Sequence, residues 1–191
     1  MKNYFKLTTE TKVNLWGVTL YRIELTVDCK WGKAGDKGGF IQKESNLSGN
    51  AWVSGNAWVY GDARVSGDAR VYGDARVYGD ARVSGDARVS GDAWVYGNAW
   101  VYGDARVYGD ARVSGDAWVY GDAWEISPLQ IQGTKHFFNI CAKGKIQIGC
   151  MSFNFEHWKK EFTIIGKEAG YTEEQIKEYG LYIDLAIKLN P

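Results

Sequence analysis

Apolar and small residues recur along the central part of the chain with a period of six. From Leu47 to Trp124 a hexad repeats thirteen times without an insertion, and its first position is Val in twelve units and Leu in the first. The third position is always Gly, the fourth Asp or Asn, and the fifth Ala, whereas the second is Ser or Tyr and the sixth Trp or Arg. Such a short, fixed period predicts a solenoid whose units stack on their neighbours.

The variation within the hexad predicts which side chains point inward. Alternate residues of an extended strand share a face, so the Ala at position five and the Val at the next position one point into the core together. The Trp or Arg between them and the Ser or Tyr after them point outward. Gly followed by Asp or Asn is expected to form a corner, because Gly adopts any φ and Asp and Asn tolerate the left-handed region.

This pattern resembles the hexapeptide-repeat proteins known from acyltransferases, which form left-handed parallel β-helices. The resemblance covers all thirteen units and implies that three units close one triangular coil, so that residues eighteen apart stack along the axis. A right-handed or four-sided helix is the alternative. Several flanking residues share the register, and with them we expect about five coils: Ile41, Ser45, Leu129, Ile131, Gly133 and Phe137.

The regions on either side of the repeats are expected to cap a mainly β fold. We predict an N-terminal β cap over residues 1–40, a solenoid over 41–136 and a C-terminal cap over 137–191. The N-terminal cap is expected to be a meander over residues 2–8 and 11–27 that turns at Gly17, with these inward residues: Val18, Leu20, Ile23, Leu25 and Val27. The C-terminal cap is expected to contain a β-hairpin of Phe137–Ala142 with Lys145–Met151, a helix over 154–169, and a second helix that starts at a Thr172–Gln175 capping box.

Charge and cysteine content narrow the classes of partner and compartment. The formal net charge is zero, with eight basic and five acidic side chains in residues 1–46 and seven Arg against ten Asp in the repeats. Duplex-DNA binding, which usually comes with a basic excess, is therefore disfavoured. The first residues lack the apolar segment of a signal peptide, and no apolar run is long enough for a membrane span. The three cysteines lie outside the repeats and are expected to be reduced thiols in a cytoplasm.

The flanks of the repeats carry a second resemblance. The segments Leu20–Ile23 and Gly38–Leu47, together with the helical tail, resemble the corresponding parts of uncharacterised YGDARV-array proteins of bacteriophages and prophages. No activity comes with that resemblance. It implies a bacterial cytoplasm as the setting, with the blocking of a host defence as one role.

The residues that acyl-transfer, metal and glycoside chemistry require are sparse. The repeats contain no histidine, and His136 and His157 lie apart in the C-terminal region without partners at metal-ligand spacing. Turn formation explains why an aspartate recurs at each corner. These aspartates are therefore not predicted to form the acid pairs of a glycoside hydrolase or a metal site. We expect no enzymatic activity, no cofactor and no metal. The alternatives are an acyltransferase-like enzyme with His136 or His157 as base, and a structural protein of the virion.

Stacking at eighteen residues sorts the outward side chains into three faces. Face one carries Trp52, Arg70, Arg88, Arg106 and Trp124, beside Ser54, Tyr72, Ser90 and Tyr108. Face two carries Trp58, Arg76, Trp94 and Arg112, beside Tyr60, Tyr78, Tyr96 and Ser114. Face three carries Arg64, Arg82, Trp100 and Trp118, beside Ser66, Ser84, Tyr102 and Tyr120.

Each face suggests a different role. Face two alternates Trp with Arg and is expected to be structural. Face one is expected to bind an anion, because Arg recognises phosphate or carboxylate and Trp or Tyr stacks on a base. Its predicted ligand-binding residues are Trp52, Arg70, Tyr72, Arg88, Arg106, Tyr108 and Trp124. A host protein or a nucleotide-like molecule would fit this face, unless corner residues such as Asp68, Asp86 and Asp104 neutralise the arginines. Face three is expected to mediate homo-oligomer formation through Trp100, Tyr102, Trp118 and Tyr120.

Overall fold

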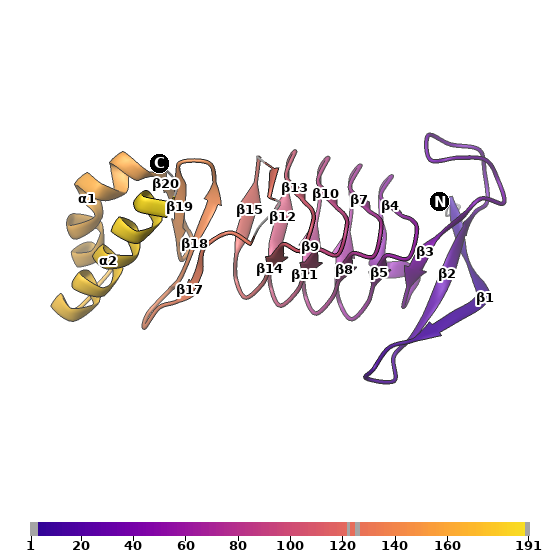
Figure 1. The fold of residues 1–191 in the computed structure, drawn as a ribbon, viewed down its shortest axis with the longest axis horizontal. Helices are drawn as coiled ribbons and strands as arrows, with labels where there is room; N and C mark the ends of the chain where they lie inside the picture. Colours follow the sequence, from indigo (N-terminus) through magenta and orange to yellow (C-terminus); the bar gives the residue numbers. More distant parts are fainter. Residues whose placement is uncertain (1–3, 122, 125–126, 190–191) are drawn as a thin grey trace.

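The repeats form a rod that has an antiparallel sheet at one end and a pair of helices at the other (Figure 1). The structure is a computed structural model, and it describes residues 4–121, 123–124 and 127–189. Each hexad contributes one short strand, and strands eighteen residues apart pair in parallel, as predicted for three units per coil. The chain therefore winds as a three-sided parallel β-solenoid.

The strands of the coils fall into three parallel sheets, one for each face. The sheet of face one contains β4 (Trp52–Val53), β7 (Arg70–Val71), β10 (Arg88–Val89), β13 (Arg106–Val107) and β16 (Ala123–Trp124). The sheet of face two contains β5 (Trp58–Val59), β8 (Arg76–Val77), β11 (Trp94–Val95) and β14 (Arg112–Val113). The sheet of face three contains β6 (Arg64–Val65), β9 (Arg82–Val83), β12 (Trp100–Tyr102) and β15 (Trp118–Tyr120).

The repeats make about four coils, and the prediction of about five was wrong at the C-terminal end. Upstream, Ile41 pairs with Val59 as its register requires. Downstream, β17 (Gln130–Gln132), which holds Ile131, pairs antiparallel with β18 (Phe137–Ala142), so this segment has left the coil. The alternating apolar residues of this segment belong to the C-terminal antiparallel sheet instead. Alternation with a period of two predicts a strand but does not specify which strand it pairs with.

The core of the rod is made of the two residue types that the hexad places inward. Every Val and Ala from Ala51 to Val119 at these positions is fully buried, with an exposed fraction of 0%. Backbone hydrogen bonds of mostly 2.8–3.1 Å join successive coils, for example from Arg70 N to Ala87 O and from Arg88 N to Ala105 O. Because Ala and Val are small, the three sheets approach closely and the rod stays narrow.

The corners depend on glycine alone for the left-handed conformation. The corner glycines from Gly49 to Gly121 have φ between 62° and 76°, whereas no other described residue type has a positive φ. The expectation that Asp and Asn share this conformation was therefore wrong. Some of these residues instead form contacts between coils, as in the 2.9 Å hydrogen bond from Asn98 Nδ2 to Asp116 Oδ1.

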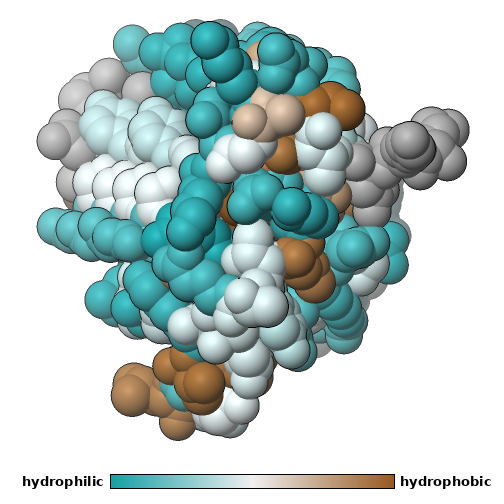
Figure 2. Space-filling model, turned by 90° about the vertical axis from the view of Figure 1, so that its right-hand side faces the viewer, coloured by the Kyte–Doolittle hydropathy of each residue, from teal (hydrophilic) through white to brown (hydrophobic). Residues whose placement is uncertain are grey.

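The N-terminal cap is a three-stranded antiparallel meander that continues the sheet of face two. It consists of β1 (Phe5–Val13), β2 (Thr19–Leu25) and β3 (Lys37–Ile41), and β3 pairs in parallel with β5. Leu20, Ile23 and Leu25 are buried as predicted, but Val27 is 48% exposed because β2 ends at Leu25. Figure 2 shows hydrophobic side chains at the tip of the β1–β2 hairpin, where Leu15 is 96% exposed.

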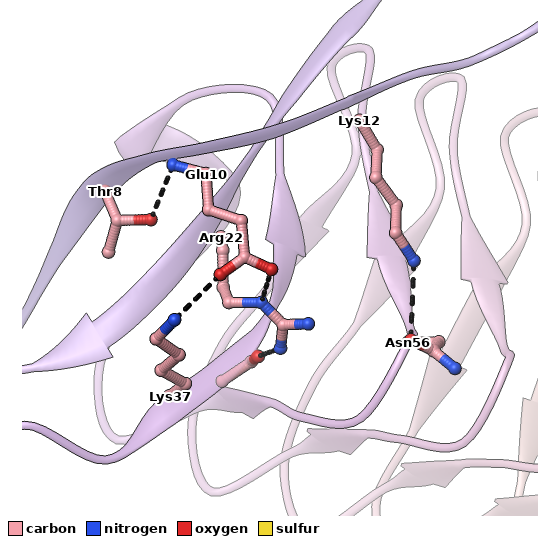
Figure 3. A network of polar contacts seen from close by, with 7 residues as sticks. Thr8, Glu10, Lys12, Arg22, Lys37 and Asn56 are labelled. Carbon is pink, nitrogen blue, oxygen red and sulfur yellow. Dashed lines mark hydrogen bonds and ion pairs between the residues drawn. The ribbon is translucent and has the colours of Figure 1, made fainter.

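Polar contacts hold the three strands of this cap together (Figure 3). The Glu10 carboxylate of β1 accepts hydrogen bonds from Arg22 Nε at 2.7 Å and from Lys37 Nζ at 2.9 Å. The Arg22 guanidinium also donates to the Gly38 carbonyl at 2.8 Å. The Lys37 and Arg22 side chains lower the pKa of Glu10, so the network is complete at neutral pH.

The C-terminal cap is an antiparallel sheet covered by two helices. Its strands are β17, β18, β19 (Lys145–Ile148) and β20 (Met151–Asn154), and its helices are α1 (Phe155–Glu168) and α2 (Glu173–Leu189). The helices were predicted correctly, and the capping box is present, with Gln175 N bonded to Thr172 Oγ1. The predicted hairpin is part of a four-stranded sheet, and its tight turn brings Ala142 opposite Lys145.

Candidate functional site

The arginines of face one form a continuous column. In the backbone register Arg88 lies between Arg70 and Arg106, and Trp52 precedes Arg70 in the next coil toward the N-terminus. The predicted last member, Trp124, is out of register, because Ala123 pairs with Arg106 and Trp124 pairs with Val107. The predicted register, with Trp124 opposite Arg106, was therefore wrong. The Trp124 side chain lies outside the described part of the chain.

The guanidinium groups of this column carry charge that the corner aspartates do not neutralise. Neither Arg70 nor Arg88 forms an ion pair with any described residue, and both side chains are exposed. The carboxylate of Asp68, which was a candidate to neutralise them, pairs with Lys30 instead. Unpaired arginines that stack at the strand spacing repel one another by about 1 kcal/mol per neighbouring pair in water. This face is therefore available to an anion.

The loop between β2 and β3 turns the N-terminal half of face one into a pocket of about 590 Å³. Lys30, Trp31 and Lys37 line it from the cap, and Arg70, Tyr72 and Arg88 are among the residues that line it from the coils. The Trp31 ring lies against two cations, with its centroid 4.3 Å from Arg70 Cζ and 4.5 Å from Lys30 Nζ. Asp36 also lines the pocket, and Lys30 and Lys37 are paired with Asp68 and Glu10. Among the described residues, the unpaired positive charges of the pocket are therefore those of Arg70 and Arg88, which lie beside aromatic walls.

Hydrogen bonds within the loop and to the first coil fix the position of Trp31. Its indole Nε1 donates to the Asn50 carbonyl at 2.7 Å. The Asp36 carboxylate accepts from Lys33 N, and the Asp28 carboxylate accepts from Ala34 N, both at 2.8 Å. A preformed loop lowers the entropic cost of ordering a binding site.

The sequence did not reveal that this loop belongs to the site. Lys30 and Trp31 contact face one only because β3 joins the coil next to β5, and no local motif signals that junction. The predicted residue Trp52 does line the pocket, although it is only 7% exposed because it is buried in the junction between the cap and the first coil. Trp31 adds a second aromatic wall.

Face two has the ladder of cations and rings that its sequence predicted. Arg76 Cζ lies 4.9 Å from the Trp58 ring centroid and 5.1 Å from that of Trp94, and Arg112 continues the ladder on Trp94. Beside it, the rings of Tyr60, Tyr78 and Tyr96 stack nearly parallel, with centroids 5.0 and 5.1 Å apart. These side chains form cation–π and stacking contacts between successive coils, so face two stabilises the rod.

Face three brings its four predicted aromatic residues together. Each of their side chains packs against another of the four rather than extending into solvent. The rings of Trp100 and Trp118 meet edge to face at 5.7 Å, and those of Tyr102 and Tyr120 lie 5.3 Å apart. All four side chains are half-buried. The C-terminal sheet borders them, since the Tyr120 hydroxyl lies 3.3 Å from Ser152 Oγ.

The two histidines lie in the C-terminal cap, away from the coil faces. The His136 ring lies 5.7 Å from that of Tyr171, and the His157 ring packs 4.2 Å from that of Phe153. Among the described residues no group of three His, Cys, Asp or Glu side chains has the spacing of a metal site. Nor does a described helix have the length and apolar content to cross a membrane.

Comparison with known proteins agrees with this architecture. The family described as the YdcK beta solenoid repeat matches eight overlapping segments, all within the hexads: residues 57–73, 63–79, 69–85, 75–91, 81–97, 87–103, 99–115 and 105–121. A search of curated proteins finds no match. The protein is therefore a β-solenoid of the repeat type. Its central coils are similar to those of the YdcK beta solenoid repeat, and that similarity covers about a third of the chain.

Proposed function

We propose that this protein is a non-enzymatic binding and scaffold protein that engages an anionic partner through face one and the adjoining pocket. The observation that carries the proposal is the pair Arg70 and Arg88, which line the pocket without an ion-pair partner among the described residues. Arg presents a planar fork of donors that suits phosphate or carboxylate. An anion between these side chains would remove their mutual repulsion as it binds.

The proposal also includes a cellular location, an origin and an oligomeric state, each suggested by the sequence. We place the protein in the cytoplasm of a bacterial host, encoded by a phage or prophage, where the partner is a host protein or a nucleotide-like anion and binding blocks a defence system. We further propose a left-handed coil, and self-association through Trp100, Tyr102, Trp118 and Tyr120. Light scattering of a Trp100→Ser/Trp118→Ser variant tests the self-association, and an unchanged mass would rule it out.

Calorimetric titration with inorganic tripolyphosphate tests the anion site. We expect binding at low salt that weakens as the salt concentration rises, because exposed charges are screened. The double variant Arg70→Gln/Arg88→Gln should bind at least tenfold more weakly. Arg64→Gln/Arg82→Gln is the matched control, since it removes two stacked arginines from face three, away from the pocket. Equal losses in both variants, or no binding by the unmodified protein, would refute the proposal.

A further inference from the structure

The tyrosine column of face one lacks a ring where face two has one. On face two the column reads Tyr60, Tyr78 and Tyr96, and its rings stack nearly parallel. On face one the corresponding column reads Tyr72, Ser90 and Tyr108. Both columns have the same backbone register, with Tyr78 N bonded to Val95 O at 3.0 Å and Ser90 N bonded to Val107 O at 2.9 Å. The serine therefore takes the position that a stacked ring occupies on the other face.

The resulting gap has the thickness of one aromatic ring. Neighbouring strands are about 4.8 Å apart, so the Cα atoms of Tyr72 and Tyr108 are separated by about 10 Å. On face two the same interval holds Tyr78, whose centroid lies 5.0 Å from one neighbouring ring and 5.1 Å from the other. Tyr72 is 39% exposed and contacts no other ring among the described residues. Tyr72 also lines the pocket, so part of its ring is accessible to a ligand.

The gap adjoins the positive charge of the proposed anion site. Ser90 follows Arg88 by two residues and shares its outward face, which sets the two about 6.5 Å apart along the strand. Arg88 in turn lines the pocket with Arg70 and Lys30. A ligand whose ring fills the gap would therefore reach the pocket with an anionic group on a short linker. A nucleotide has this arrangement, since its pentose joins a planar base to phosphate.

We infer that face one binds a nucleotide unit, with the base stacked between Tyr72 and Tyr108 above Ser90 and the phosphates held by Arg88 and Arg70. This inference rests on the proposed function, because it assigns a ligand class to the same anion site. Base stacking on aromatic side chains tolerates every base, so the site would not select a sequence. The same chemistry is offered by a free nucleotide and by a single-stranded nucleic acid.

The inference can be tested with two ligands that share a phosphate chain. ATP should bind at least tenfold more tightly than inorganic tripolyphosphate, because only ATP carries a base. The variant Ser90→Tyr should complete the tyrosine column and fill the gap, so that ATP loses its advantage while tripolyphosphate binds as before. Ser84→Tyr is the matched control, because it extends the tyrosine column of face three and leaves face one intact. Tyr72→Ser, which places a common repeat residue at this position, should also remove the advantage.

The outcomes separate this inference from the proposal on which it rests. If ATP and tripolyphosphate bind the unmodified protein equally well, or if the preference for ATP survives Ser90→Tyr, the base site is refuted and the anion site stands. If neither ligand binds, both ideas fail. A short single-stranded oligonucleotide identifies the source of the nucleotide: tighter binding of the strand than of ATP points to nucleic acid, and weaker binding points to a free nucleotide.

Discussion

At the scale of single residues, the glycines of most corners meet two requirements at once. They supply a positive φ, and their missing Cβ atoms let the corners of successive coils stack closely. A Cβ built on Gly67 would lie 3.0 Å from the backbone N and O of Gly85, whereas one built on Gly103 would meet no atom within 4 Å. The two positions have similar φ, 69° and 65°, so they separate backbone strain from crowding.

Substituting these two glycines should show how much each requirement contributes. We expect Gly103→Ala to lower the free energy of unfolding by about 1–2 kcal/mol, the cost of placing an L-residue in the left-handed region. Gly67→Ala should lower it by a further 1–3 kcal/mol or so, because the Gly85 backbone must move. Denaturant unfolding of both variants measures the difference. Equal losses would show that crowding between corners contributes nothing.

At the scale of elements, the caps supply side chains to the open backbone groups of the terminal coils. At the N-terminal end Asn46, in the single turn of 3-10 helix η1 (Glu44–Asn46), donates from Nδ2 to Ala63 O at 2.8 Å. At the C-terminal end Gln147 Oε1 accepts from Trp118 N, and Asn139 Nδ2 donates to Trp118 O, both at 3.0 Å. Unpaired strand edges promote aggregation, and these amide side chains satisfy them within the chain.

The coil and both helices could be predicted from the sequence because the residues that each one buries recur at a regular spacing. The sequence could not predict the amide contacts, since Asn139 and Gln147 occur in strands where a polar residue is expected to face solvent. Both are buried, with exposed fractions of 0% and 2%. The pocket was missed for a related reason: the columns follow from the repeat, but the position of Trp31 depends on how the cap sheet joins the coil.

The same substitution at two asparagines tests the capping role. Asn46 is fully buried and Asn56 is an exposed corner residue, where most repeats have Asp. Asn46→Asp should lower the free energy of unfolding at pH 7 by about 2–4 kcal/mol, because the carboxylate cannot donate to the carbonyl of Ala63 and is buried. Asn56→Asp should change it by less than about 0.5 kcal/mol. Thermal unfolding compares the two variants.

Acidification adds a check on this explanation. Burial beside carbonyl oxygens should raise the pKa of the new carboxyl at position 46 above its value in the unfolded chain. The folded variant then binds a proton more readily than the unfolded one, so the deficit relative to the unmodified protein should shrink as the pH falls through that pKa. A deficit that stays constant from pH 7 to low pH would contradict a buried, charged carboxylate.

At the scale of the whole molecule, stability is expected to grow coil by coil, because each coil contacts only its neighbours. The C-terminal cap nevertheless fits the last coil of the solenoid in only one rotation about its axis. On face two, Gln130 Oε1 accepts a hydrogen bond from Ser114 N at 2.8 Å. On face three, Gln147 Oε1 accepts one from Trp118 N. Two faces of the last coil therefore bind different side chains of the cap. The cap should therefore dock only where the last hexads have the correct rotation.

Two internal deletions test this dependence on phase. Removing residues 92–109 deletes one full coil, joins Gly91 to Asp110 and keeps every later residue on its face. Removing residues 104–109 deletes a single hexad, joins Gly103 to Asp110 and turns every later residue onto the next face. We expect the longer deletion to unfold cooperatively at a lower temperature and the shorter one to lose cap docking and aggregate, although it removes fewer residues. Circular dichroism melting and size-exclusion chromatography measure both effects, and a six-residue deletion as stable as the eighteen-residue one would contradict three hexads per coil.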